Sequence, residues 1–169
     1  MPILDVHSME FISRGVEQTR RLGMRLGALL HPGDLVCLVG DLGSGKTTFV
    51  QGVASGWGSL DPVTSPTFVL VNVYRRRGAG RVEQKLFHLD AYRLSGASEA
   101  ADLDLEALLD QGPLVIEWAE RIEQVLPPEM LRVRLRWIEE NQRDLVFSAH
   151  GPRYEAMLAS LRRQVFGVS

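Results

Sequence analysis

Residues 40–47 read Gly-Asp-Leu-Gly-Ser-Gly-Lys-Thr, which is the spacing of a phosphate-binding loop. The glycines allow a tight turn that brings backbone N–H groups close to phosphate oxygens. Lys46 can reach the β- and γ-phosphates as a compact charge, and the Thr47 hydroxyl can bind Mg²⁺. The motif therefore predicts a nucleotide and a magnesium ion as ligands. The residues expected to contact the nucleotide are Asp41, Leu42, Gly43, Ser44, Gly45, Lys46, Thr47 and Thr48.

The lysine usage of the chain supports this interpretation. Of the 19 Lys and Arg residues, only Lys46 and Lys85 are lysines. Since arginine provides the positive charge almost everywhere else, a lysine inside the loop indicates a site that needs an ammonium group. The flanking segments also fit, because an apolar, strand-like run at 35–39 precedes the loop and a helical pattern begins at its end. The alternative is a glycine-rich turn that binds nothing.

Two acidic residues, Asp90 and Glu117, stand at the ends of apolar, strand-like runs. Side chains at the carboxyl edge of a parallel sheet commonly bind ligands, and a phosphate loop needs an acid to hold the Mg²⁺ shell or to orient a water molecule. We expect Lys46, Asp90 and Glu117 to be catalytic, and either acid is a candidate for either of these two roles. The alternative for either acid is a helix cap or a solubilising strand end.

Three further features are ambiguous. His88 beside Asp90 resembles half of a transition-metal site, but no additional His or Cys lies nearby, so we do not expect one. Trp118 can stack on a ligand or simply pack in the fold. Residues 141–144 read Asn-Gln-Arg-Asp, in which Gln replaces the Lys of a guanine-reading motif, and this favours adenine over guanine.

The hydroxyl-rich segment 64–68 follows the loop helix in the sequence. Many phosphate-loop proteins keep a segment that senses the γ-phosphate in this position. An ordinary Ser-Pro turn is an equally good interpretation.

The composition is that of an ordinary globular protein. The 169 residues are 45% hydrophobic and 24% charged, with a net charge of -2, so nothing global indicates nucleic-acid binding. We interpret the arginine clusters at 75–77 and 132–136 as solvated faces rather than as a nucleic-acid patch. The single Cys37 fits a reducing compartment. With no secretory signal or membrane span in the sequence, we expect one cytoplasmic domain over residues 1–169.

Hydrophobic periodicity and turn residues predict the order of the elements. We expect a helix at 13–30 capped by Ser13, a strand at 35–39, a helix at 46–55, strands at 68–74 and 85–92 joined by a mobile connection at 75–81, a helix at 98–112, a strand at 114–118, a brief helix ending before 127, strands at 131–138 and 145–149, and a helix at 152–165. This order predicts an α/β, P-loop NTPase-like three-layer fold with a mixed, mainly parallel central sheet and a late antiparallel hairpin.

Five blocks together carry a family resemblance: residues 40–49, 64–68, 88–94, 116–121 and 126–127. Their order and spacing, from about residue 13 to 150, resemble the TsaE (YjeE) family, the small bacterial ATPase of tRNA threonylcarbamoyladenosine (t6A) formation. The phosphate loop alone would not name a family, but the Ser-Pro-Thr-Phe, Leu-Asp-Ala-Tyr-Arg and Ile-Glu-Trp blocks do.

The resemblance implies ATP and Mg²⁺ as the ligands of this site. Lys46 and the loop amides would bind the ATP phosphates, Thr47 and Glu117 would ligate Mg²⁺, and Asp90 would be needed for hydrolysis. Arg143 would lie near the nucleotide.

The resemblance also implies partners. Residues 64–68 would act as a switch-like segment, and the TsaD–TsaB heterodimer would be the partner. TsaD transfers the threonylcarbamoyl group, so tRNA would contact this chain indirectly or weakly. The chain departs from the family pattern at Val73, Ala91, Asp104 and Ala119, none of which is in the phosphate loop.

The expected function is therefore an ATP-hydrolysing accessory subunit of a tRNA-modifying complex. One alternative is a small-molecule or nucleotide kinase, in which residues 75–81 would form an arginine-bearing lid. A second alternative is a nucleotide switch that binds without hydrolysis.

Overall fold

The computed structural model describes residues 5–63, 71–94 and 97–167. The strands are β1 (Ser8–Ser13), β2 (Leu35–Val39), β3 (Val71–Arg77), β4 (Glu83–Asp90), β5 (Leu114–Glu117), β6 (Met130–Glu139) and β7 (Gln142–His150). The helices are α1 (Val16–Gly27), α2 (Lys46–Trp57), α3 (Ala97–Ala101), α4 (Leu105–Gln111) and α5 (Pro152–Phe166), with 3₁₀ turns η1 (Ala79–Arg81), η2 (Ala91–Arg93) and η3 (Ala119–Val125).

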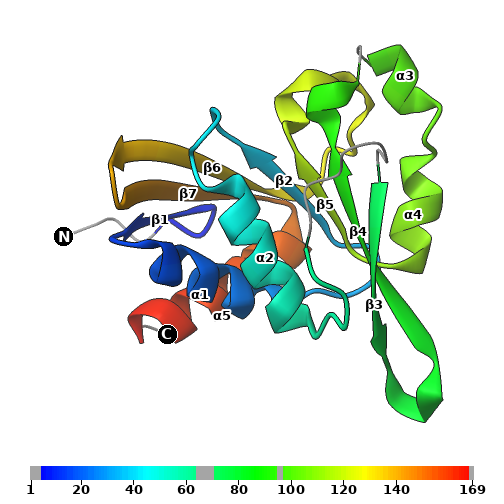
Figure 1. Ribbon diagram of the computed structural model, residues 1–169, viewed down its shortest axis with the longest axis horizontal. Helices are drawn as coiled ribbons and strands as arrows, with labels where there is room; N and C mark the ends of the chain where they lie inside the picture. Colours follow the sequence, from blue (N-terminus) through cyan, green and yellow to red (C-terminus); the bar gives the residue numbers. More distant parts are fainter. Residues whose placement is uncertain (1–4, 64–70, 95–96, 168–169) are drawn as a thin grey trace.

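The strands form one seven-stranded sheet in the order β1-β7-β6-β2-β5-β4-β3 (Figure 1). The central strands β6, β2, β5 and β4 pair in parallel. β3 is antiparallel to β4, and β7 is antiparallel to both β6 and β1. All strands except β7 and β3 therefore run in one direction. The predicted mixed, mainly parallel sheet with a late antiparallel hairpin is confirmed.

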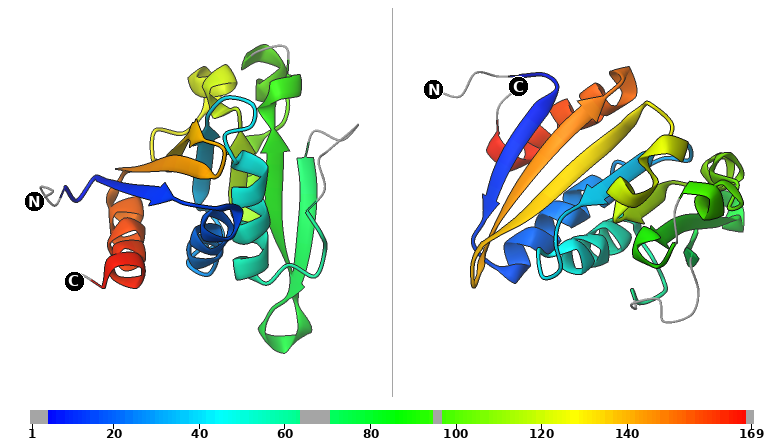
Figure 2. Two further views of the ribbon diagram at one scale, coloured as in Figure 1. Left: turned by 60° about the vertical axis from the view of Figure 1, so that its left-hand side comes forward. Right: turned by 90° about the horizontal axis from the view of Figure 1, so that it is seen from above.

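Helices cover both faces of this sheet, which gives the predicted three layers. Val36 and Leu38 of β2 pack with α1, α2 and α5 in one core cluster. Leu35 and Cys37 point the other way, into a second cluster with α4 and η3. This alternation follows from the two-residue period of a strand. The right-hand view in Figure 2 shows β1, β7 and β6 in front of α5 and α1. Among the described residues, no helix is long and apolar enough to cross a membrane.

Helices α1 and α2 meet at an unusually close contact made by glycines. A Cβ on Gly52 would lie 2.0 Å from the Arg20 carbonyl oxygen, and a Cβ on Gly56 would lie 1.9 Å from that of Met24. Reciprocally, a Cβ on Gly27 would lie 2.0 Å from a backbone oxygen of α2. The two backbones are thus in direct contact, and this contact fixes the helix that follows the phosphate loop.

The prediction that Ser13 caps the first helix is wrong. Ser13 is the last residue of β1, a strand that the sequence did not reveal, and α1 begins at Val16 after an N-cap Gly15. The Ser13 hydroxyl donates to the Gly15 carbonyl at 2.8 Å and accepts from the Thr19 hydroxyl at 2.7 Å. Its hydroxyl therefore fastens the strand-to-helix turn instead of capping a helix.

The connection expected at 75–81 is mostly a β-ribbon. β3 continues through Arg77, paired with β4, and the ribbon projects beyond the sheet (Figure 1). Arg76 is held within it because its guanidinium lies 4.3 Å from the centroid of the Trp57 ring and its Nε donates to Gln84 at 2.6 Å. These contacts come from distant parts of the chain.

The helix expected at 98–112 is broken in two. Asp104 has a left-handed backbone (φ 48°) and is the N-cap of α4, where its carboxylate accepts from the Ala107 N–H at 3.2 Å. Glycine adopts this conformation most easily, and aspartate is among the few other residues that adopt it as single residues.

Candidate functional site

The phosphate-loop motif forms the turn between β2 and α2, as predicted. Gly40, Gly43 and Gly45 all have positive φ, at 157°, 77° and 104°. At Gly40 the space is also closed, because an added Cβ would lie 2.4 Å from the Leu135 carbonyl oxygen. The loop thus needs glycine both for its backbone conformation and for its contact with β6. It ends at the N-terminus of a 12-residue helix, whose free N–H groups and dipole favour an anion.

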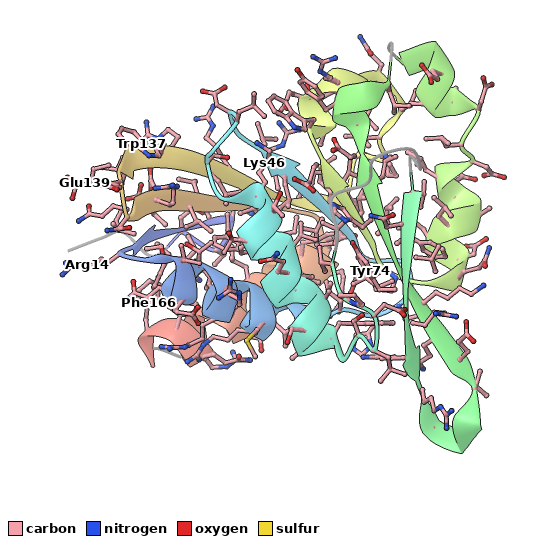
Figure 3. The ribbon with its side chains drawn as sticks, viewed as in Figure 1. Arg14, Lys46, Tyr74, Trp137, Glu139 and Phe166 are labelled. Carbon is pink, nitrogen blue, oxygen red and sulfur yellow. The ribbon has the colours of Figure 1, made fainter. Side chains whose placement is uncertain are left out.

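Lys46 is the first residue of α2 and is only 6% exposed (Figure 3). Its ammonium donates to the Gly40 carbonyl, to the Asp41 carbonyl at 2.7 Å and to the Ser44 hydroxyl at 3.3 Å. It also lies 4.2 Å from the centroid of the Trp118 ring, which is a cation–π distance. The loop therefore folds around its own lysine and holds that charge at the helix N-terminus.

The surroundings of Lys46 are acidic. Burial lowers the pKa of Lys46, because it disfavours the charged form, and nearby carboxylates act in the opposite direction. These carboxylates belong to Glu117, Glu120, Asp41 and Asp90. The structure thus brings the predicted acids to the lysine. It adds Glu120, which sequence reasoning missed although this residue comes three positions after Glu117.

Asp90 and Glu117 lie side by side. They are register partners at the carboxyl ends of the parallel strands β4 and β5. Asp90 also accepts from the Tyr92 N–H at 3.0 Å, so this acid caps η2 as well as facing the site. The predicted metal donors, which are these carboxylates and the hydroxyl of Thr47 at the start of α2, all present oxygen atoms. That set fits Mg²⁺, which takes one or two protein oxygens and completes its shell with phosphate and water.

His88 does not pair with Asp90. Its Nε2 contacts Glu117 Oε2 at 2.5 Å and its Nδ1 contacts the Tyr74 hydroxyl at 2.8 Å. Both ring nitrogens are thus engaged by protein groups, which leaves neither for a metal. Within the described ranges, no group of three or more His, Cys, Asp or Glu side chains is placed to hold a metal ion.

Trp118 lies at the site and also packs against the second core cluster. Its backbone is left-handed (φ 59°), which is rare for a residue other than glycine and typical of functional sites. The ring is 5.0 Å from that of Tyr92, and the Arg121 guanidinium lies 4.7 Å from the Tyr92 ring centroid. The indole is therefore held between the aromatic ring of Tyr92 and the ammonium of Lys46.

A small hollow lies on the other side of the loop, between the β1–α1 turn, the start of α2 and the tip of the β6–β7 hairpin. It is lined by Gly15, Val16, Thr19, Gly45, Thr48, Glu140, Asn141 and Arg143. Gly15, Val16 and Thr19 were not predicted as site residues, because no motif marks the turn before α1. Thr48 and Arg143, both predicted, line this hollow.

Arg143 lies against the phosphate loop, with its Cγ 3.7 Å from the position of a Cβ on Gly45. Its Nη1 donates to the carbonyls of the hairpin tip, including those of Glu139 and Gln142, each at 2.9 Å. Its Nε is buried and has no partner among the described residues. The predicted switch-like segment 64–68 lies outside the residues that the structure describes.

Comparison with known proteins identifies the family of these features. The family model "Threonylcarbamoyl adenosine biosynthesis protein TsaE" matches residues 13–145. The tRNA threonylcarbamoyladenosine biosynthesis protein TsaE of Bacillus subtilis is 38% identical over 147 residues, covering 87% of this chain and 89% of the relative. The protein of that name in Streptomyces coelicolor is 47% identical over 117 residues, covering 69% and 77%. The crystal structure of Bacillus subtilis YdiB superposes with a TM-score of 0.75 at 32% identity, covering 93% of this chain and 95% of that one.

Proposed function

Because the chain belongs to the TsaE family of threonylcarbamoyl adenosine biosynthesis, we propose that it is a Mg²⁺-dependent ATPase that acts on the TsaD–TsaB heterodimer. The observation that carries this proposal is the meeting of three features at one point. The phosphate loop opens α2, Lys46 stands at its first position, and Asp90 and Glu117 approach that lysine from neighbouring strand ends.

We propose distinct roles for the residues of the site. The loop amides and Lys46 bind the β- and γ-phosphates and neutralise the charge that develops during transfer. Asp90 orients the attacking water, and Thr47 and Glu117 hold the metal. Held there, Mg²⁺ would supply Lewis-acid chemistry by withdrawing charge from the phosphate oxygens. The carboxylates around Lys46 favour its charged form and so oppose the effect of burial on its pKa.

The hollow beside Thr48 and Arg143 is the proposed site of the adenosine. It opens directly beside Gly45, so a nucleotide whose phosphates occupy the loop can extend into it. The unpartnered Nε of Arg143 is a donor that a ribose or phosphate oxygen can satisfy. This placement gives Arg143 the nucleotide contact that the family resemblance implied.

The structure does not favour the kinase alternative, which depended on an arginine-bearing lid at residues 75–81. Arg75, Arg76 and Arg77 lie on β3, and Arg76 packs on Trp57 at the last position of α2. Lys46 is at the first position of the same 12-residue helix, so the two ends are about 16 Å apart at a rise of 1.5 Å per residue. This distance argues against an arginine lid over the phosphates from this ribbon.

We further propose that the chain works as a single domain in the cytoplasm, where tRNA is modified. The transfer chemistry on tRNA would belong to the partner, and ATP hydrolysis by this chain would act on the partner complex.

Two substitutions test the assignment of the site. Lys46→Ala and Glu117→Gln should each lower ATP turnover by at least about 100-fold, because the first removes a positive charge that stabilises the transferred phosphoryl group and the second removes the negative charge that would hold the metal. Lys85→Ala is the matched control, since Lys85 is the other lysine of the chain and lies on β4 away from the loop. Release of inorganic phosphate is the measurement. Normal turnover in either site variant would contradict the assignment.

A further inference from the structure

Three buried polar side chains from neighbouring strands form a hydrogen-bonded row on the sheet face that carries α2. Tyr74 lies on β3, His88 on β4 and Glu117 on β5, with exposed fractions of 3%, 1% and 6%. The Tyr74 hydroxyl is 2.8 Å from His88 Nδ1, and His88 Nε2 is 2.5 Å from Glu117 Oε2. Figure 3 shows Tyr74 on its strand, well away from Lys46. The row thus connects an outer strand to the acid of the proposed metal site.

The register of the sheet explains how the row forms. Tyr74 is opposite Leu86, so His88 is its diagonal neighbour on the next strand. His88 is opposite Val115, so Glu117 is in turn diagonal to His88. Residues two apart on a strand share a face, and diagonal neighbours are within reach of long side chains. The three groups therefore meet because of the strand pairing, although 14 and 29 residues separate them in the chain.

The hydrogen bonds of the row are consistent with His88 as the donor to Glu117. An ionised carboxylate only accepts hydrogen bonds, so His88 Nε2 carries the hydrogen that Glu117 receives. Nδ1, on the other side of the ring, lies within hydrogen-bond distance of the Tyr74 hydroxyl. Burial raises the pKa of Tyr74 to about 12, partly opposed by a hydrogen bond with Asn72, so the phenol retains its proton. Both ring nitrogens of His88 thus have a polar partner, which fixes the orientation of the imidazole ring.

The row leaves one carboxylate oxygen of Glu117 for the site. Among the described residues, the hydrogen bonds to this carboxylate involve Oε2. A glutamate has three rotatable side-chain bonds, and pinning one oxygen at a fixed donor removes most of this freedom. Partners of this kind orient the ligands of metal sites in many proteins.

On the basis of the proposed function, we propose that His88 is a positioning residue for Glu117. The Nε2–H of His88, itself oriented by Tyr74, holds Oε2 and so presents Oε1 to the metal shell or to a water molecule. His88 does not touch the nucleotide in this account. It acts on turnover only through the orientation of the Glu117 carboxylate.

Three variants of the row and one control test this proposal. His88→Leu removes the donor and keeps an apolar side chain, whereas His88→Gln places an amide N–H near the position of Nε2. Tyr74→Phe removes only the hydroxyl that orients the ring. The control is Tyr154→Phe, because the Tyr154 hydroxyl is also buried and accepts one hydrogen bond, from the Leu35 N–H at 2.9 Å at the far end of β2.

The assays separate positioning from folding. We would measure kcat and KM for ATP, the Mg²⁺ concentration at half-maximal rate, and the affinity for a fluorescent ATP analogue in EDTA. His88→Leu should lower kcat and raise the Mg²⁺ concentration at half-maximal rate, and the product of the two changes should be about 10- to 100-fold. Nucleotide affinity in EDTA should stay unchanged. His88→Gln should recover most of the rate. Tyr74→Phe should show a smaller loss of the same kind, and Tyr154→Phe should show none.

Further outcomes would overturn the proposal. One is a His88→Leu protein with the kcat and the Mg²⁺ midpoint of the wild type. Another is an equal loss of kcat in His88→Leu and His88→Gln, accompanied by weaker nucleotide binding in EDTA. If His88→Leu fails to fold, unchanged kcat in Tyr74→Phe overturns it instead. Glu117→Gln, measured in parallel, separates the two hypotheses. Normal turnover there contradicts the proposed function, whereas an inactive Glu117→Gln beside a fully active His88→Leu contradicts this inference alone.

Discussion

The close glycine contact between α1 and α2 predicts whether an alanine at Gly52 stabilises or destabilises the protein. On helix propensity alone, Gly52→Ala should stabilise the protein by about 1 kcal/mol, because alanine is the better helix former. In the structure, however, the new methyl carbon would lie 2.0 Å from the Arg20 carbonyl oxygen, against the 3.4 Å at which ordinary contact begins. Backbone cannot rotate away as a side chain can, so the two helices must separate.

The magnitude follows from these two opposing effects. Overpacking of this kind costs typically 1–3 kcal/mol, and a backbone overlap belongs at the upper end, about 3 kcal/mol. After subtraction of about 1 kcal/mol for propensity, we expect Gly52→Ala to be less stable by about 2 kcal/mol. For a protein of this size that corresponds to a melting temperature lower by roughly 4–8 °C.

Urea denaturation followed by circular dichroism measures the effect. Ser55→Ala is the matched control, since Ser55 lies on the same helix with an exposed side chain, and its stability should change by no more than about 0.5 kcal/mol. A Gly52→Ala protein as stable as the wild type, or more stable, would refute the close contact of the two helices.

Three further predictions concern stability and reactivity. Burial raises the pKa of Cys37 to about 12, so the thiol should not react with a disulfide reagent at pH 8 until the protein unfolds; rapid reaction of the native protein would contradict its burial in β2. The Arg153 guanidinium donates to both oxygens of the buried Asp34 carboxylate, at 3.0 and 2.8 Å, so Arg153→Ala should lower the free energy of unfolding by about 1–3 kcal/mol, and an unchanged urea midpoint would show that solvent replaces it without cost. Asp104→Ala should lose about 1 kcal/mol, because it removes a cap and keeps the left-handed backbone, whereas Asp104→Gly should stay close to wild type; equal losses in the two variants would refute this account of the break between α3 and α4.

The parts of the fold that the sequence predicted correctly are those determined locally. The apolar run at 35–39, the phosphate loop and the helix after it are contiguous, and each has a pattern that few other structures share. The antiparallel pair of β6 and β7 was equally clear, because Leu131, Val133 and Leu135 alternate with arginines before a polar turn. The placement of Asp90 and Glu117 beside Lys46 could also be expected, since parallel strands end at a common edge.

The features that were missed depend on contacts between distant segments. β1 is short and only half of its residues are apolar, and it is a strand because it pairs with β7. Arg75, Arg76 and Arg77 resemble a loop by composition, yet they pair with β4, and Arg76 is held by Trp57. Tertiary pairing overrides local preference in such cases.

The candidate site shows the same division between local and distant contacts. The motif residues were predictable, whereas the row formed by Tyr74, His88 and Glu117 was not, because its members come from three strands. No spacing in the sequence reveals that the register will align them. His88 drew attention through its neighbour Asp90, but its actual partners are residues 14 and 29 positions away.

The proposed function is tested most directly by ATP turnover of this protein, alone and with the TsaD–TsaB heterodimer of the same organism, with inorganic phosphate as the readout. We expect slow turnover by the protein alone and a clear increase when the heterodimer is added, with Lys46→Ala inactive under both conditions. Turnover that the heterodimer does not change, together with the absence of a complex between the proteins, would contradict the proposed function.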